Sequence, residues 1–185
     1  MSLRTNCCRK GIEDNNPGSR AILEMTSESK YKHIFIYYSA SAEGFRNCRP
    51  LIGLDGTHLK NKYQGILLSA TAVDAVGQLF PLSYAIVNAE NDENWSWFLS
   101  ILKSIIHDNM PTFLTPNMLT ILSDRQKGLI DSVNRHFPNS ANGYCLRHLE
   151  ANFHKVFKNI ELKTFIWRAA GAKDQAKYDK AMESM

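Results

Sequence analysis

The sequence LIGLDGTHLK, residues 51–60, decides the fold class that we expect for this chain. A short apolar run, 51–54, stops at Asp55, and Gly56 follows it. An apolar run of this length between turn signals is typical of a buried central strand. A carboxylate is rarely buried unless it is paired or bound to a metal. We therefore predict that Asp55 lies where a core strand opens to solvent, which is the usual place for a site in an open α/β sheet.

A second stretch, MLTILSD at residues 118–124, repeats this design, and a helical pattern follows it. If the two strands are parallel neighbours, Asp55 and Asp124 emerge at the same edge of the sheet. Two anionic oxygen ligands side by side suit Mg²⁺ or Mn²⁺ and not zinc. The alternative is that each Asp caps the turn or helix after its strand, which Asp does well. The residues alone leave both interpretations open.

Composition narrows the class of protein. The chain has 185 residues with 44% hydrophobic content, which fits one globular domain, or one domain with an arm. The net charge of +4 is compatible with a nucleic-acid partner without requiring one. No apolar stretch is long enough for a membrane span, and no secretory signal is visible, so we expect no membrane partner. The four cysteines fit neither a disulfide framework nor a four-cysteine zinc site.

The pattern along the chain predicts an α/β protein with a mixed sheet. We expect a polar arm, a hairpin in which His33 is half-exposed, a loop, and then a three-strand antiparallel meander that begins with the Asp55 strand. Pro81 in the third meander strand indicates an edge position or a bulge. Apolar residues at helical spacing follow in several stretches, so helices should flank the sheet. In order, we predict the arm at 1–19, strands at 21–25 and 31–38, the loop at 39–49, meander strands at 50–55, 66–73 and 79–87, a helix at 95–106, a strand at 119–123, a helix at 129–137, a very short strand at 143–145, and helices at 146–157 and 162–169.

Two long runs resemble the core of Mutator-like element (MULE) transposases of eukaryotes. The similarity extends from about Tyr31 to the C-terminus and is densest from Arg49 to Phe157, where DGTHLK, ENWSWFL, SDRQKGL and a C-x-x-H pair occur in the family's order and spacing. The resemblance implies a ribonuclease H-like fold with a DDE triad of acids. It also implies Mg²⁺ or Mn²⁺ as cofactor and double-stranded DNA, transposon ends and target, as partner. It further implies a nuclear location and possible homo-oligomers.

The resemblance assigns Asp55 as the first acid and Asp124 as the second. In the family the third acid is a Glu that follows a long helical insertion, and no residue here matches it. Glu161 has the spacing found in relatives without the insertion, although an exposed helix charge is the simpler interpretation. We accordingly divide the chain into an N-terminal arm with the hairpin start (1–30), a catalytic core (31–145) and the beginning of an insertion (146–185), and expect an incomplete core.

Further residues near the two acids are candidates for accessory roles. The cations could bind flanking phosphates, or could be ordinary solvated surface. The Cys and His of the C-x-x-H pair could act near the acids, or could be a buried thiol with a hydrogen-bonded imidazole. The three tryptophans Trp95, Trp97 and Trp167 are expected to pack in the fold. The accessory candidates are His58, Cys145 and His148, and the phosphate-binding candidates are Lys60, Lys62, Arg125 and Lys127.

The favoured function is therefore metal-dependent DNA cleavage and strand transfer by a transposase core. A second hypothesis is a domesticated DNA-binding or transcription-regulating protein that kept the fold and lost catalysis, as in the far-red-response regulators of plants. A third is a non-functional remnant of an element.

Overall fold

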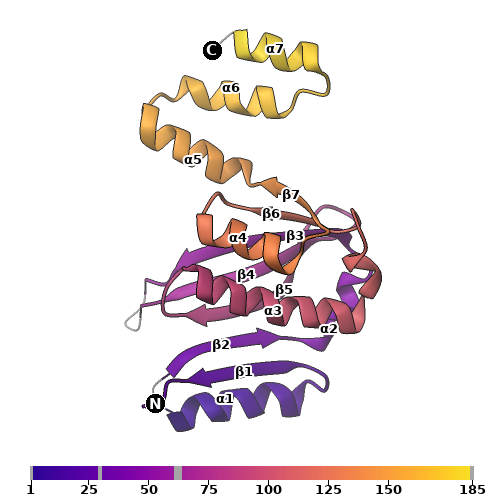
Figure 1. The fold of residues 1–185 in the computed structure, drawn as a ribbon, viewed down its shortest axis with the longest axis vertical. Helices are drawn as coiled ribbons and strands as arrows, with labels where there is room; N and C mark the ends of the chain where they lie inside the picture. Colours follow the sequence, from indigo (N-terminus) through magenta and orange to yellow (C-terminus); the bar gives the residue numbers. More distant parts are fainter. Residues whose placement is uncertain (1, 29–30, 61–63, 184–185) are drawn as a thin grey trace. The chain divides into compact units, whose positions relative to one another are not determined.

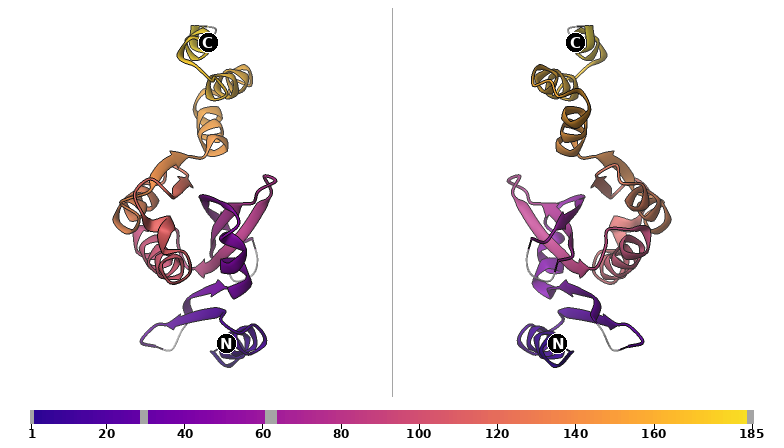
Figure 2. Two further views of the ribbon diagram at one scale, coloured as in Figure 1. Left: turned by 90° about the vertical axis from the view of Figure 1, so that its right-hand side faces the viewer. Right: turned by 90° about the vertical axis from the view of Figure 1, so that its left-hand side faces the viewer.

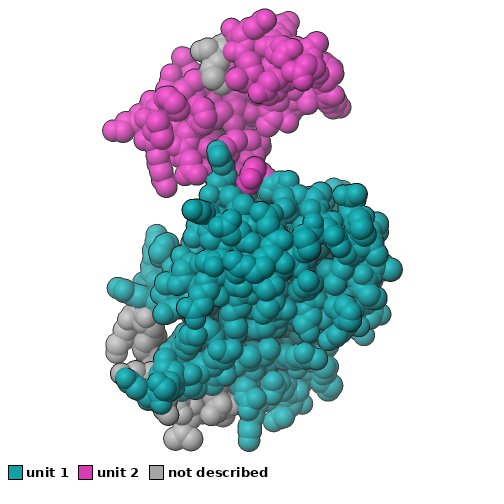
Figure 3. All heavy atoms as spheres, viewed as in Figure 1, with its two compact units in different colours: residues 1–143 teal, residues 144–185 magenta. Residues whose placement is uncertain are grey.

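The fold is built on a seven-stranded sheet. The computed structural model describes residues 2–28, 31–60 and 64–183, with side chains from residue 9 onward. It divides into two compact units, residues 1–143 and 144–185 (Figure 3). The strand order is β1-β2-β5-β4-β3-β6-β7 (Figure 1). The strands are β1 (Arg20–Met25), β2 (Tyr31–Tyr37), β3 (Arg49–His58), β4 (Ile66–Val73), β5 (Leu79–Val87), β6 (Thr120–Ser123) and β7 (Ala141–Tyr144).

The strand directions confirm the predicted mixed sheet. β3, β4 and β5 pair antiparallel as a meander, and β6 pairs parallel to β3. The hairpin β1–β2 joins the meander through β5. Because β3 and β5 both run opposite to β4, they point in the same direction, and β6 shares it. The C-terminal ends of β3, β5 and β6 therefore lie at one edge of the sheet, which we name the carboxyl edge.

Helices α3 (Asp92–Asn109) and α4 (Lys127–His136) cover one face of this sheet (Figures 1 and 2). Burial alternates strictly along β4, so one set of side chains faces the helices while the other set stays half-exposed. The predicted apolar stripe of α3 is fully buried against the sheet, which confirms its core role. It consists of Trp95, Phe98, Leu99, Leu102, Ile105 and Ile106.

Two segments for which the sequence predicted no helix are helical. The polar arm forms α1 (Ser2–Asn15), which packs along β1, where Glu13 accepts a hydrogen bond from the Ala21 backbone N–H at 3.2 Å. The loop expected at 39–49 contains α2 (Ser39–Phe45), which has no side-chain cap to mark its start. Its Phe45 is fully buried, edge-on to the Phe113 ring. The loop prediction was wrong because contacts with distant residues, and not local signals, stabilise α2.

Pro81 lies at a bulge in a central strand. β5 pairs with β2 on one side and β4 on the other, so the edge-strand alternative was wrong. The register shifts where Thr71 faces Pro81, and the pairing with β2 ends at Ser83. The bulge alternative is therefore confirmed, since the missing N–H of proline falls where the ladder is already interrupted.

His33 is buried, with 1% of its surface exposed, which corrects the prediction of a half-exposed residue. Its Nε2 lies 2.9 Å from Oε2 of Glu24, and its ring stacks on Trp97 at 3.8 Å. The Trp97 indole N–H donates to Glu24 Oε1 at 2.8 Å. Burial alone would raise the pKa of the Glu24 carboxyl, but these two hydrogen bonds and the nearby charges hold that pKa below its usual value. The cluster joins β1, β2 and α3, and Trp97 packs as predicted.

The second unit consists of α5 (Leu146–Phe157), α6 (Glu161–Ala170) and α7 (Gln175–Glu183), and the two predicted helices of this region are confirmed. Lys158 adopts a left-handed conformation that ends α5. Glu150 of α5 accepts hydrogen bonds from Lys163 and Trp167 of α6 at 2.8 and 2.7 Å. Trp167 is 44% exposed, so its part in packing is limited. Throughout the described ranges, no helix combines the length and the apolar character that crossing a membrane requires.

Candidate active site

Asp55 and Asp124 occupy equivalent positions on neighbouring parallel strands. Gly53 of β3 pairs with Leu122 of β6, and each aspartate stands two residues further along its strand. Leu54, next to Asp55, is buried on the helix-covered face. Since side chains alternate along a strand, both aspartates belong to the opposite, half-exposed face at the carboxyl edge. The strand arrangement that the metal hypothesis required is present.

The surroundings of Asp55 are polar and partly open to solvent. Its side chain is half-buried, and the Thr57 hydroxyl donates to its Oδ2 at 3.3 Å. The hydroxyl of Ser69, across the ladder on β4, donates to the Asp55 backbone carbonyl at 3.4 Å. These contacts orient the end of β3 and leave the carboxylate at a water-accessible rim.

Asp124 closes the turn into α4. Its Oδ1 accepts a hydrogen bond from the Gln126 backbone N–H at 2.9 Å, and the Gln126 side chain in turn accepts from the Leu129 N–H at 2.6 Å. Asp124 therefore has the capping role that the sequence left open. Because a carboxylate has two oxygens with several acceptor sites, this bond is compatible with a metal ligand at the same residue.

A third carboxylate, Glu90, lies at the same edge, and the sequence analysis missed it. A Cβ placed on Gly56 would lie 2.7 Å from Glu90 Oε1, so the carboxylate rests directly on the residue after Asp55. The Trp95 indole N–H donates to Oε1 at 3.3 Å. Burial raises the pKa of the Glu90 carboxyl above its usual value, and the negative charges of Asp124 and Asp55 raise it further, which outweighs the Trp95 hydrogen bond. Because side chains alternate along β3, the Gly56 contact places the Glu90 carboxylate on the helix-covered face, opposite the face of Asp55.

A signal for Glu90 was available in the sequence. The first and third strands of a meander run in the same direction, so an acid soon after the third strand falls at the same edge as Asp55. The acidic segment 88–94 was interpreted only as the start of a helix, which it also is. Asn91 caps α3 by accepting from the Asn94 N–H at 2.9 Å.

The N-termini of α3 and α4 meet beside these acids. A Cβ on Gly128 would lie 2.9 Å from the Asp92 backbone nitrogen, so glycine permits this close approach. Ser132 of α4 also donates to Asp92 Oδ1 at 2.8 Å. Helix N-termini carry partial positive charge, which favours anions nearby. The helices therefore support a concentration of carboxylates at the carboxyl edge.

A cavity of about 420 Å³ opens next to Glu90. His58, exposed at the end of β3, lines it together with Gly65 and Asn88. The cavity brings this accessory candidate beside the third carboxylate. Its role toward phosphate or metal stays a prediction.

The cationic candidates lie on the surface near the acids. Lys60, Arg125 and Lys127 are exposed, Lys127 as the first residue of α4. Lys62 lies outside the described residues. Exposed cations at this edge can reach phosphate groups, and binding itself stays a prediction.

The remaining candidates belong to the second unit. Cys145 is the residue that precedes α5, and His148 lies in the first turn of that helix. Glu161 is the exposed first residue of α6, and its backbone N–H donates to Asn159 at 2.8 Å. The roles of Cys145, His148 and Glu161 near the acids stay predictions.

The donor set at the carboxyl edge fits a hard divalent cation. Asp55 and Asp124 supply carboxylate oxygens, which Mg²⁺ and Mn²⁺ prefer over the nitrogen and sulfur ligands of zinc sites. Within residues 9–28, 31–60 and 64–183, no group of three or more His, Cys, Asp or Glu side chains is arranged to hold a metal. The role of the two aspartates as metal ligands stays a prediction.

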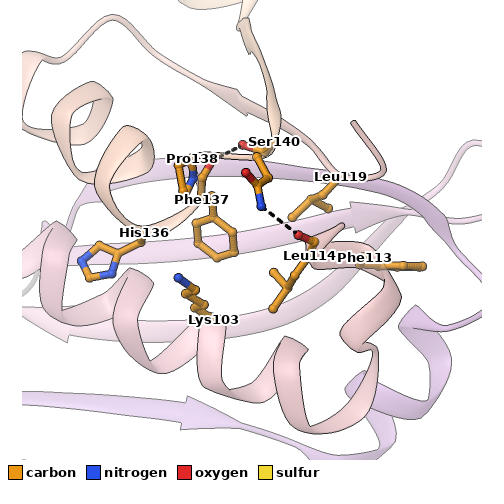
Figure 4. A pocket seen from close by; sticks show the side chains of 9 residues that line it. Lys103, Phe113, Leu114, Leu119, His136, Phe137, Pro138 and Ser140 are labelled. Carbon is orange, nitrogen blue, oxygen red and sulfur yellow. Dashed lines mark hydrogen bonds between the residues drawn. The ribbon is translucent and has the colours of Figure 1, made fainter. Parts of the chain in front are cut away.

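A smaller cavity, of about 60 Å³, lies at the opposite end of β6 (Figure 4). Phe137, Leu114 and Leu119 form its apolar wall, with Lys103 and His136 at its side. Asn139 donates to the Leu114 carbonyl there at 3.4 Å. It contains no carboxylate, so the chemistry expected of this chain does not belong to it.

The family model of the MULE transposase domain matches residues 51–152, more than half of the chain. The chain belongs to this family. The match spans Asp55, Glu90 and Asp124, and it confirms the resemblance drawn from the sequence motifs.

Similarity to individual proteins is weaker. Protein FAR1-RELATED SEQUENCE 6 of Arabidopsis thaliana is 22% identical over 142 residues, which cover 77% of the MULE domain chain and 19% of that protein. The chain thus spans about a fifth of this relative's length. The crystal structure of the catalytic domain of Mos1 mariner transposase is 14% identical, with a TM-score of 0.36, covering 74% of this chain and 76% of that chain. The Mos1 catalytic domain with raltegravir and Mn is 12% identical, with a TM-score of 0.37, covering 78% and 83% respectively.

Proposed function

We propose that this MULE domain is the catalytic core of a transposase that cuts DNA at the ends of a mobile element. The observation that carries the proposal is the parallel pairing of β3 with β6, which sets Asp55 and Asp124 at equivalent positions on one edge. The family match gives this pair a chemical context, because it covers both strands. Activity of a whole protein, its strand transfer and its nuclear location are part of the proposal.

The residues of the carboxyl edge have distinct tasks in this proposal. Asp55 and Asp124 hold Mg²⁺ or Mn²⁺. A divalent cation bound there lowers the pKa of an attacking water or 3′-hydroxyl and stabilises the leaving oxygen of the phosphodiester. Lys60, Arg125 and Lys127 bind flanking phosphates and position double-stranded DNA without reading its sequence. Lys62 joins them on the sequence evidence alone.

Nicking of supercoiled plasmid tests the proposal. The 185-residue chain is incubated with plasmid and MnCl₂, and the open-circular product is quantified for the wild type, Asp55→Ala and Asp124→Ala. Asp131→Ala, on the exposed side of α4, is the matched control. We expect nicking by the wild type and the control and none above background by the two site variants. Equal nicking by all four proteins would remove both aspartates from the mechanism.

A second candidate function is DNA binding without catalysis. The similarity to FAR1-RELATED SEQUENCE 6 favours it. Fluorescence anisotropy with a labelled duplex separates the two functions. Binding that is the same in EDTA and in MgCl₂, together with no nicking at any metal concentration, would support the binding function over the nuclease.

A further inference from the structure

Three positive side chains gather where the end of α4 packs against α3, away from the carboxyl edge. Lys103 extends from α3, and Arg135 and His136 belong to the last turn of α4. Lys103 and His136 line the cavity of about 60 Å³, beside Phe137 (Figure 4). Helix α4 has 10 residues and is about 15 Å long, so this cluster lies well away from the turn that holds the second aspartate.

Ser96 of α3 joins the two side chains from α4. Its Oγ lies 2.8 Å from Nε2 of His136, and Nη1 of Arg135 donates to the same oxygen at 3.3 Å. Both side chains are thereby held at one position on the surface of α3. A hydroxyl group rotates to suit its partners, so this serine can also donate to an anion that binds there.

The charges that act on His136 are mostly positive. Burial lowers the pKa of its imidazole below the usual value, and the charges of Arg135 and Lys103 lower it further, against the opposing effect of Asp92. Asp92 is already engaged, since Arg135 Nη2 lies 3.6 Å from its Oδ2 and Ser132 donates to its Oδ1 at 2.8 Å. Lys103 forms no ion pair with a carboxylate in the part of the chain that the structure describes. Its charge is therefore available to a ligand.

The simplest alternative is that these cations only complement the negative C-terminal end of α4. Arg135 and His136 lie in its last turn, where positive charge is favourable. That reason does not extend to Lys103, which is half-buried on α3 beside the apolar wall formed by Phe137 and Leu114. Apolar groups exclude water, and charges interact more strongly where water is excluded. The position of this lysine thus favours an anionic ligand.

We propose that Lys103, Arg135 and His136 form a binding site for a phosphate group of a DNA backbone, separate from the carboxyl edge. A cavity of about 60 Å³ holds roughly four water molecules. It therefore has no room for a base or a sugar, and only the phosphate group enters. Arginine and lysine are the usual partners of phosphate, and backbone contacts of this kind position DNA without reading its sequence. Neither the aspartates nor a metal takes part in this site.

Fluorescence anisotropy with a labelled duplex in EDTA tests the site without metal. Lys103→Gln removes the charge, and Lys103→Arg retains it. Lys10→Gln is the matched control, because it removes the same charge from an exposed position on α1. We expect the slope of the logarithm of the binding constant against that of the salt concentration to become less steep by about 0.9 in Lys103→Gln, as loss of one phosphate contact predicts. Lys103→Arg and the control should keep the wild-type slope.

NMR of the histidine side chains adds a local measurement. The chain has six histidines, so their imidazole signals can be followed one by one. The duplex should shift the signal of His136 and leave that of His33, which is buried against Trp97, unchanged. In Lys103→Gln the shift of His136 should be smaller at the same duplex concentration. Thermal melting of each variant confirms that it is folded before titration.

The outcomes separate this inference from the proposed function. If the wild type binds no duplex, or if Lys103→Gln binds it like Lys10→Gln, the inference is overturned, and nicking that depends on Asp55 would still support the function. A His136 signal that moves with inorganic phosphate but not with the duplex would also overturn it, since the ligand would then be a free anion. A weaker salt dependence in Lys103→Gln alone, in a protein that does not nick plasmid, would support the site and overturn the catalytic proposal.

Discussion

Asp55→Asn should stabilise the metal-free protein and remove its stabilisation by Mn²⁺. In the absence of metal, Asp55 stands beside Asp124 on the neighbouring strand. Like charges held together by the fold repel one another, and the unfolded chain is relieved of this repulsion. Asparagine keeps the shape of the side chain and an acceptor for the Thr57 hydroxyl, so the charge is the main change.

The magnitude follows from the strand spacing. Neighbouring strands lie about 4.8 Å apart. Two unit charges about 5 Å apart repel by about 1 kcal/mol in water and about 3 kcal/mol at an effective dielectric constant of 20. Both carboxylates are half-buried, so solvent reaches them and we take the lower value. For a chain of 185 residues, an increase of about 1 kcal/mol in the free energy of unfolding raises the melting temperature by about 2–4 °C.

Mn²⁺ should reverse the order of stability. A ligand that binds only the folded state stabilises it by about 2.7 kcal/mol at a free concentration of about 100 times its dissociation constant. The wild-type melting temperature should then rise by about 5–10 °C. Asp55→Asn should show little change, because it has lost one of the two ligands, and the wild type becomes the more stable protein.

Thermal melts followed by circular dichroism, in EDTA and in MnCl₂, measure both effects. Asp131→Asn is the control, since it removes the same charge from an exposed position on α4 and should respond to Mn²⁺ like the wild type. A melting temperature of Asp55→Asn in EDTA no higher than that of the wild type would refute the repulsion. An equal Mn²⁺ response in Asp55→Asn and the wild type would refute the metal site.

Two further predictions concern the framework that positions the site. Gly44→Ala should destabilise the protein by about 1–3 kcal/mol in urea unfolding, because its Cβ would lie 2.5 Å from the Phe80 ring. The matched change Gly11→Ala should be stabilising or neutral, because a Cβ added there would meet no atom within 4 Å. An equal loss of unfolding free energy in both variants would show that the clash with Phe80 is not the cause. Glu24→Gln should lower the free energy of unfolding by about 1 kcal/mol at pH 7. The loss is small because this carboxylate is half-exposed and solvent screens its hydrogen bonds. The pKa of the folded carboxyl lies below its usual value of 4.5, so its contribution is present above that pH and lost as the pH falls further. The unfolding free energies of Glu24→Gln and the wild type should therefore converge in acid, and a constant gap down to pH 3 would exclude this role of the charge.

Local patterns in the sequence were sufficient for most of the framework. The apolar run before Asp55, the apolar stretch at 66–73 and the helical stripe from Trp95 to Ile106 each depend on residues close together in the chain. Their periods alone therefore predict a strand, a meander and a core helix. The repeated design at Asp124 also predicted that two acids would share an edge, provided that their strands were parallel neighbours. That condition is a property of the sheet, and the pairing of β3 with β6 fulfils it.

What the sequence by itself determined is the mixed fold and the family, because these follow from local periodicity and motif spacing. The prediction that the strand ends at Asp55 was wrong, since β3 continues to His58 through its pairing with β4. The tertiary structure alone decided that α2 is a helix, that His33 is buried against Trp97, and that Glu90 rests on Gly56. Each of these depends on contacts between residues far apart in the chain. Such contacts exist only after β5 and β6 have taken their places around β3 and β4.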